Sequence, residues 1–225
     1  MKMLSRALAA TLLMSAAVSG ANAGVIIGGT RVVYQGNKKE ASLSVNNPDK
    51  LAYLIQSWID APTPDAAKAP FIITPPLYRL DAGQQNEMRI IRAGQLAENK
   101  ESLFWLNIKS IPSVAKRDNT IQIAVKTRIK LIYRPESLTS TPEEQAAKLQ
   151  WSRANNSIQV NNPTPYYINF NEITVGGKRV EDATFVAPQS SARFTLPSGI
   201  NSTAVNFKII NDYGGIGDAH IASLR

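Results

Sequence analysis

The side chains that most often carry out catalysis or bind metals are nearly absent from this chain of 225 residues. It contains no cysteine and one histidine, His220, which lies near the C-terminus beside Gly and Asp residues. A thiolate nucleophile and a Cys- or His-based metal site are therefore not indicated. The Asp and Glu residues fall mostly in turns and in a polar linker, without the convergent context of a glycosidase pair. We expect a protein that is not an enzyme and has no metal or cofactor, with His220 in a solvated tail.

Hydrogen bonding by the backbone is the chemistry for which residues 120–135 (TIQIAVKTRIKLIYRP) are suited. Successive side chains of a strand point to opposite faces, so the segment predicts one unusually long strand with an apolar and a basic face. At a sheet edge, such a strand offers free N–H and C=O groups to another chain. The alternative is an ordinary core strand with a basic outer face. The apolar face holds Ile121, Ile123, Val125, Thr127, Ile129, Leu131 and Tyr133, and the other holds Lys126, Arg128, Lys130 and Arg134.

Short runs rich in β-branched and aromatic residues recur from Val25 onward, separated by turn clusters. This spacing, without a helical period, predicts antiparallel sandwiches of the immunoglobulin type. A polar, proline-marked segment divides the runs into two series. We therefore predict an all-β chain with an immunoglobulin-like domain at residues 24–137, a linker at 138–144 and a second such domain at 145–225. Thr141, Pro142 and Glu144 have capping-box spacing and predict one short helical turn.

The first residues have the features of an export signal. Basic residues precede the apolar run at 7–18, and Ala21-Asn22-Ala23 satisfies the small-residue rule for cleavage. We expect residues 1–23 to be removed, which leaves Gly24 at the N-terminus and lowers the net charge from +8 to about +6. The mature protein is expected to be soluble and exported, and its charge favours an acidic partner. The export signal and the lack of a nucleic-acid motif argue against binding to nucleic acid.

The segment LAENKESLFWLNIKSIPS, at residues 96–113, closely resembles the signature of the periplasmic pilus chaperones of Gram-negative bacteria. This resemblance implies two immunoglobulin-like domains set at an angle, like a boomerang, with a cleft between them, and it implies a periplasmic protein. It extends over almost the whole mature chain. Further matching segments are Gly24-Val25, Thr30-Arg31-Val32, LIQSW at 54–58, ITPPL at 73–77, RIKLIYRP at 128–135, NPTPYY at 162–167 and INDYG at 210–214.

The resemblance implies donor-strand complementation, in which the chaperone lends an edge strand to a pilin whose own sandwich lacks its last strand. Such a chaperone prevents aggregation of pilin subunits and delivers them to an outer-membrane usher for pilus assembly. Carried over position by position, Ile121, Ile123 and Val125 match the apolar positions that fill the pilin groove. Arg31 and Lys130 match the pair that anchors the C-terminal carboxylate of the pilin, so both cations are expected to face the cleft.

Two further sets of residues follow from the resemblance. Glu101, Arg134 and Asp212 match a charged trio that bridges the domains and fixes the cleft angle, although a surface salt bridge of little value would look the same in sequence. An uncovered apolar edge also invites pairing with a second copy, so we expect weak self-association of the free protein. The usher is implied to contact the first domain at Leu54, Gln56 and Ile111, where packing residues are the alternative.

Two other functions remain open. A secreted carbohydrate-binding or adhesive β-sandwich would bind its ligand through loops and aromatic rings. Trp58, Trp105 and Trp151 offer such rings, but all three fall within strand runs and are interpreted as core residues. The second rival is an exported glycosidase. Only the chaperone predicts binding that depends on the free C-terminal carboxylate of a partner.

Overall fold

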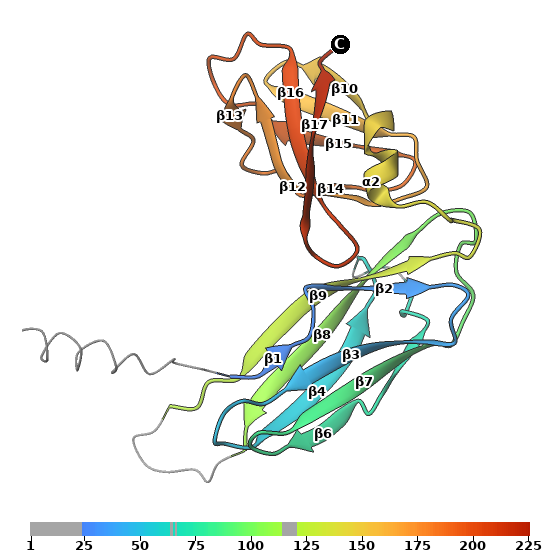
Figure 1. Ribbon diagram of the computed structural model, residues 1–225, viewed down its shortest axis with the longest axis vertical. Coiled ribbons are helices and arrows are strands. Elements are labelled where there is room, and N and C mark those ends of the chain that lie inside the picture. Colours follow the sequence, from blue (N-terminus) through green and yellow to red (C-terminus); the bar gives the residue numbers. More distant parts are fainter. Residues whose placement is uncertain (1–23, 64, 66, 114–120) are drawn as a thin grey trace, which may run out of the picture.

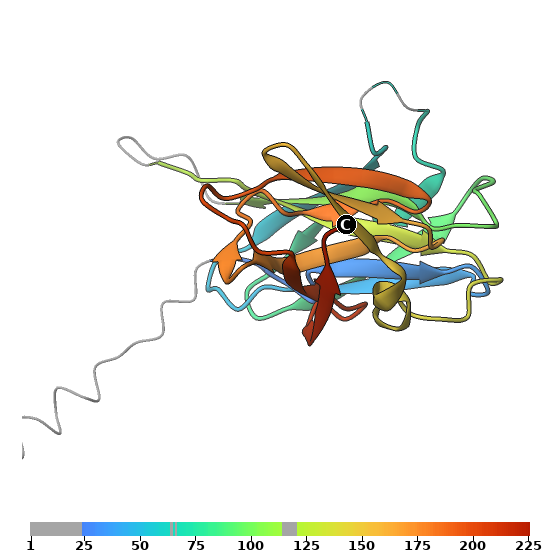
Figure 2. The same cartoon turned by 90° about the horizontal axis from the view of Figure 1, so that it is seen from above.

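The strands of the chain form two β-sandwich domains joined end to end at an angle in the computed structural model, which describes residues 24–63, 65, 67–113 and 121–225 (Figure 1). The expected signal at residues 1–23 lies outside the described residues. Seen along the long axis, the second domain lies over the first (Figure 2). The all-β architecture of two domains confirms the prediction from strand spacing.

The first domain pairs its strands in two sheets, with the orders β1-β3-β7-β5 and β2-β9-β8-β4-β6. Alternate residues of each strand point between the sheets, where Val45, Ile55 and Leu106 are fully buried. The predicted alternation holds in the second half of β9, because Ile129, Leu131 and Tyr133 belong to this core. The strands are β1 (Ile26–Ile27), β2 (Arg31–Gln35), β3 (Glu40–Asn46), β4 (Tyr53–Asp60), β5 (Phe71–Thr74), β6 (Leu77–Leu80), β7 (Gln85–Arg92), β8 (Ser102–Pro112) and β9 (Val125–Arg134).

The second domain also has two sheets, one with the order β10-β11-β15 and one with the order β13-β12-β16-β17, in which β14 also pairs with β12. Aromatic rings dominate its core, where Phe170 contacts Phe194 and Phe207 edge to face and lies 5.7 Å from Trp151. The strands are β10 (Gln150–Ala154), β11 (Ser157–Asn162), β12 (Ile168–Val175), β13 (Lys178–Arg179), β14 (Phe185–Val186), β15 (Ser190–Thr195), β16 (Ala204–Ile210) and β17 (Ile216–Ser223).

A short helix, α2 (Pro142–Gln145), opens the second domain and continues into a 3-10 turn, η1 (Ala146–Lys148). The Thr141 hydroxyl accepts from the N–H of Glu144, and the Glu144 carboxylate accepts from the N–H of Thr141. Both halves of the capping box are therefore present, as the spacing predicted.

The long strand expected at residues 120–135 is shorter in the structure. β9 begins at Val125, residues 121–124 belong to no strand, and Thr120 lies outside the described residues. The ladder between β8 and β9 ends at the pair Ser110 and Val125, although β8 itself continues to Pro112. Side-chain alternation continues past the end of the hydrogen-bonded ladder, so it overestimates strand length.

The prediction that His220 lies in a solvated tail is wrong, because the C-terminal segment is a strand. It forms β17, which pairs antiparallel with β16, and His220 stacks on Phe207 with ring centroids 5.0 Å apart. The sequence of β17, IGDAHIAS, is poor in β-branched and aromatic residues, so its composition gave no strand signal. Pairing with a strongly β-forming neighbour supplies what intrinsic propensity lacks.

Candidate functional site

The pairing of β2 with β9 brings two cations together that are far apart in the sequence. The two strands run parallel, and Arg31 is the register partner of Lys130. Partners in neighbouring strands present their side chains on the same face of the sheet, where like charges repel. The predicted anchor pair is therefore adjacent in the structure and carries a repulsion that a bound anion would relieve.

Both cations face groups of the second domain, as expected for side chains that point into an interdomain cleft. The Lys130 ammonium donates a hydrogen bond to the Asn169 side-chain carbonyl and lies 4.3 Å from the centroid of the Phe185 ring. Arg31 Nη1 donates to the carbonyl of Ile210 over 3.3 Å. Within the described part of the chain, the buried Nε of Arg31 has no hydrogen-bond partner.

The electrostatics of this pair favour an anionic ligand. Burial and, to a smaller extent, the neighbouring charge of Arg31 together lower the pKa of Lys130 to about 8. Burial also lowers the pKa of Arg31, against the opposing attraction of Asp212 and Glu143. The two cations are thus partly desolvated and close to each other, and the Nε donor of Arg31 has no hydrogen-bond partner among the described residues. A bound carboxylate would offset the desolvation, reduce the repulsion between the two cations and accept a hydrogen bond from the free donor.

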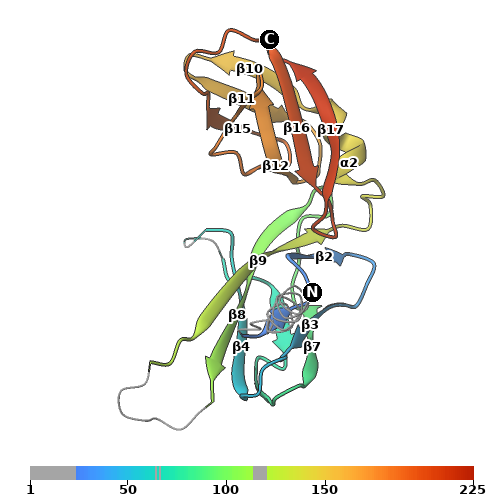
Figure 3. The same ribbon diagram turned by 60° about the vertical axis from the view of Figure 1, so that its left-hand side comes forward.

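A free strand edge lies directly beside this pair. β2 pairs with β9 only from Lys130 to Arg134, and β8 occupies the other edge of β9. Residues 125–129 therefore have, within the described residues, no strand partner on the edge where β2 would continue. Figure 3 shows β9 running along the first domain up to the junction with the second. The N–H and C=O groups of this edge are available to an incoming strand.

The three predicted donor residues stand at the start of this edge. Ile121, Ile123 and Val125 are 88%, 70% and 52% exposed. Large aliphatic side chains exposed at every second position are typical of an interaction surface rather than of a solvated loop. The structure thus leaves these side chains uncovered next to the unpaired segment of β9.

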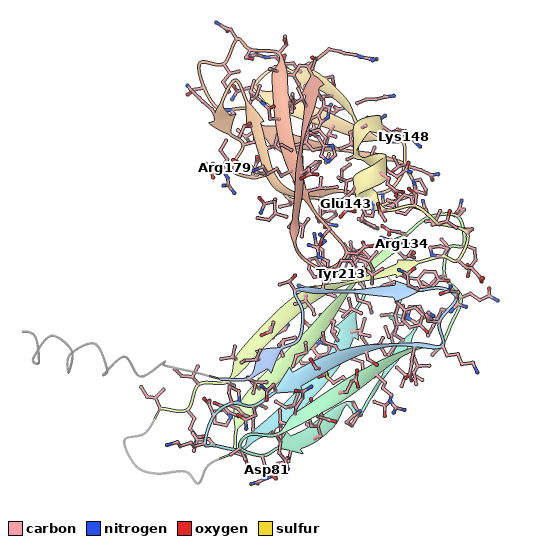
Figure 4. All side chains as sticks on the ribbon, in the orientation of Figure 1. Asp81, Arg134, Glu143, Lys148, Arg179 and Tyr213 are labelled. Atoms are coloured by element: carbon pink, nitrogen blue, oxygen red, sulfur yellow. The ribbon has the colours of Figure 1, made fainter. Side chains whose placement is uncertain are left out.

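The predicted charged trio forms a largely buried network between the domains. Arg134 Nε donates to Glu101 over 2.7 Å, while its two Nη atoms donate to the Asp212 carboxylate over 2.6 and 2.8 Å. The side chains of Arg134, Glu101 and Asp212 are 4%, 0% and 22% exposed. Figure 4 shows Arg134 at the junction of the domains. These values exclude the alternative of a solvated surface pair.

Burial is the largest influence on the pKa of Glu101 in this network. It raises the pKa of Glu101 to about 7, against the opposing charge of Arg134 and the N–H of Tyr167, which donates to the carboxylate over 2.6 Å. Burial alone would lower the pKa of Arg134, but its hydrogen bonds to Asp212 and the nearby Glu101 raise it above the ordinary value. Arg134 therefore remains charged and holds groups of both domains.

The turn between β16 and β17 is fitted closely against the start of β2 (Figure 1). Gly214 in this turn has a φ of +84°, and a Cβ atom added to it would lie 2.2 Å from the Thr30 hydroxyl oxygen. Asp212, which binds Arg134, belongs to the same turn. One short segment of the second domain thus makes both the ionic and the steric contact with the first domain.

The interpretation of Trp58 and Trp105 as core residues is wrong. Both are half-buried on the outer face of their sheet, where Lys126 lies 5.0 Å from the Trp58 ring and Arg128 lies 4.7 Å from the Trp105 ring. Their neighbours in β4 and β8 fill the core instead, and the strand period of two turns the indoles outward. Trp151 is buried in the second core, as expected.

The residues predicted to contact an usher lie on the same outer face. Leu54 and Gln56 are exposed on β4, and Ile111 is the register partner of Leu54 on β8. Leu77, on β6, is paired with Gln56 and is 55% exposed, so it extends this apolar surface. The sequence reasoning did not select Leu77, and no pattern around it marks it as exposed.

Asn169 and Phe185 are the site residues that the sequence reasoning missed. Neither is charged or exposed, and their position beside Lys130 depends on how the two domains meet. Among the described residues, no cluster of three or more His, Cys, Asp or Glu side chains is placed to hold a metal ion. No helix in the same residues is long and apolar enough to cross a membrane.

Residues 24–139 match the family described as pili and flagellar-assembly chaperone, PapD N-terminal domain, and residues 144–221 match the pili assembly chaperone PapD, C-terminal domain. The chain belongs to the PapD family of pilus-assembly chaperones. The predicted family resemblance is therefore confirmed along nearly the whole described chain.

Individual PapD-family proteins resemble this chain over most of their length. The Escherichia coli chaperone protein FocC is 42% identical over 200 residues, which cover 86% of this chain and 87% of FocC. The solved structure of the E. coli chaperone DraB has a TM-score of 0.82 at 38% identity and covers 90% of this chain and 97% of that one.

A structure of the Salmonella enterica SafA pilin in complex with the SafB chaperone matches with a TM-score of 0.83 at 33% identity, covering 92% of this chain and 99% of that one. These relatives are named as chaperones and give no support to the carbohydrate-binding alternative.

Proposed function

We propose that this pilus chaperone captures pilin subunits in the periplasm by adding residues 121–129 as a strand to the incomplete pilin sandwich, while Arg31 and Lys130 bind the C-terminal carboxylate of the subunit. The chaperone then keeps subunits from aggregating and delivers them to an outer-membrane usher. One observation carries this proposal: the unpaired edge of β9 ends at a pair of adjacent, partly desolvated cations. The pilin complex of the Salmonella relative supports the same class of partner.

Approximate free energies indicate how much of the binding comes from the charged anchor and how much from the added strand. Charge-assisted hydrogen bonds contribute roughly 1.5 to 3 kcal/mol each, so two anchors supply about 3 to 6 kcal/mol, whereas nanomolar binding requires about 12 kcal/mol. The remainder must come from the strand ladder and from burial of Ile121, Ile123 and Val125, at roughly 1.5 to 3 kcal/mol for each large aliphatic side chain.

The anchor also has a second role, which is to fix the register of the added strand. A slip by one residue would turn every apolar side chain of the added strand to the wrong face. A carboxylate held by Arg31 and Lys130 gives the ladder a fixed starting point. The usher contacts at Leu54, Gln56 and Ile111 and the weak self-association of the free chaperone stay predictions.

Binding of a peptide that copies the C-terminal strand of a pilin tests the anchor. We expect the wild-type protein to bind the peptide with a free carboxylate at least about tenfold more tightly than the amidated peptide, because one lost charge-assisted bond costs about 1.5 kcal/mol or more. In Lys130→Ala this preference should disappear while the fold remains intact. Isothermal titration calorimetry measures both affinities.

Lys126→Ala is the matched control, since Lys126 lies four residues from Lys130 on the same face of β9 but contacts Trp58 instead of the second domain. It should keep the preference for the free carboxylate. Equal binding of both peptides by the wild-type protein would contradict the proposed anchor. The protein would then be a β-sandwich that binds its partner through a strand or through loops with another specificity.

A further inference from the structure

The anchor lysine of the first domain is held by two residues of the second domain. Asn169 lies on β12 and Phe185 on β14, and the two are register partners. The side-chain carbonyl of Asn169 accepts from the Lys130 ammonium, and the Phe185 ring lies 4.3 Å from the same nitrogen. Asn169 is 3% exposed, so little solvent reaches its side chain. The free chaperone therefore contains a built acceptor for Lys130.

The chemistry of this acceptor is informative. The side-chain carbonyl oxygen of asparagine accepts the same hydrogen bond as one oxygen of a carboxylate, but the amide group carries no net charge. An aspartate at this position would neutralise the lysine, whereas an apolar residue would leave a desolvated ammonium without an acceptor. The amide satisfies one donor and leaves the positive charge uncompensated.

The aromatic partner acts in the same direction. A cation over an aromatic face is attracted by the ring, more strongly where water is excluded. The Phe185 ring is itself packed against Tyr167, with centroids 5.9 Å apart. This packing holds the ring beside the ammonium. Lys130 is thus kept in the cleft without any negative charge.

We propose that Asn169 takes the place of a carboxylate oxygen at Lys130 in the free chaperone, and that this neutral stand-in sets how strongly the cleft prefers a free C-terminal carboxylate over an uncharged chain end. Asn169 is then a positioning and specificity-determining residue of the anchor. The inference rests on the proposed function, because it concerns the same carboxylate site. When a pilin is captured, an oxygen of its C-terminal carboxylate replaces the amide oxygen of Asn169 as the acceptor for the Lys130 ammonium.

The two possible changes at Asn169 have opposite expected effects on one ratio, the affinity for the free-carboxylate peptide divided by the affinity for the amidated peptide. Asn169→Asp supplies a permanent internal carboxylate, so we expect the ratio to fall about tenfold, toward one. Asn169→Ala removes the competing acceptor and leaves Lys130 unpaired, so the ratio should rise severalfold above the wild-type value. A merely structural role would change both affinities together and leave the ratio unchanged.

Asn206→Asp and Asn206→Ala are matched controls. Asn206 lies on β16 opposite Thr174, at the other end of β12 from Asn169, and it should leave the ratio at the wild-type value. Wild-type ratios in both Asn169 variants would overturn the inference, and so would a change in the same direction in both. A wild-type ratio of one would instead contradict the proposed function itself. If Asn169→Asp fails to fold, the rise expected for Asn169→Ala decides the matter.

Discussion

At the scale of one residue, Lys130 is held in an environment that disfavours its positive charge, and this environment makes it a good binding group for an anion. Its ammonium is partly buried and lies beside Arg31, and both features lower its pKa to about 8. The charged form that binds a carboxylate is therefore less favoured in the free protein than it would be in water. A ligand that brings a negative charge is bound more tightly because it removes this penalty.

A pH dependence of capture follows from the lowered pKa. Between about pH 5 and pH 7 the lysine is protonated in both free and bound protein and the peptide carboxylate is ionised, so affinity for the free-carboxylate peptide should change little with pH. Above about pH 8 the free protein loses the proton that the bound carboxylate requires, and affinity should fall as the pH rises further. Calorimetric titrations at pH 6.5, 7.5 and 9.5 measure this change.

The amidated peptide serves as the control for this pH effect, since it gains little from the charge of Lys130. Its affinity should vary much less over the same range. Equal pH dependence for the two peptides would show that another group titrates.

At the scale of the elements, Gly214 has two reasons to be glycine. Its positive φ is strained for other residues, and an added Cβ would meet the Thr30 hydroxyl oxygen at 2.2 Å. We expect Gly214→Ala to cost about 1 kcal/mol for the backbone and at least about as much again for the steric conflict. Chemical denaturation measures the loss.

Gly83 offers the matched control for this prediction, because its φ is +69° and no atom lies within 4 Å of an added Cβ. Gly83→Ala should show the backbone cost alone. Thr30→Ala combined with Gly214→Ala should recover the steric part, since the obstructing oxygen is gone. Equal losses in Gly214→Ala and Gly83→Ala would contradict the close fit of the turn.

The sequence predicts local elements of this fold better than it predicts their partners. Alternation located most strands, and capping-box spacing located α2, because both signals depend on neighbours in the chain. The parallel register of Arg31 with Lys130 is a contact between distant segments, so only the family resemblance placed these two residues together. The same limit explains why the start of β9 was misplaced and β17 was missed, since each depends on the strand beside it.

For the whole molecule, the angle between the domains was implied by the resemblance and by no local pattern. The contacts that accompany the angle are few and specific, and Arg134 is their centre. Its removal would leave the fully buried Glu101 carboxylate without its cation, which costs about 3–5 kcal/mol in comparable sites. Asn169 could not be found from sequence for the same reason, because its role exists only once the two domains have met.

The contribution of Asp212 can be separated from that of an ordinary ion pair within the same chain. Asp81 accepts from Arg79 Nε over 2.6 Å, but the side chains of Arg79 and Asp81 are 61% and 51% exposed, and Figure 4 shows Asp81 at the far end of the first domain. Asp81→Ala should therefore change stability by less than about 1 kcal/mol. Asp212→Ala removes two hydrogen bonds from a buried guanidinium and should cost about 1.5–3 kcal/mol.

The two variants should also differ in shape. Because Asp212 joins the β16–β17 turn to β9, its loss should loosen the angle between the domains and broaden the distance distribution from small-angle X-ray scattering, while Asp81→Ala should match the wild type. A melting temperature and scattering curve of Asp212→Ala that equal those of Asp81→Ala would mean that the network does not fix the angle. The cleft would then depend on the linker, on the fit of Gly214 against Thr30 and on the remaining hydrogen bonds between the domains. Capture of the free-carboxylate peptide should in that case survive undiminished in Asp212→Ala.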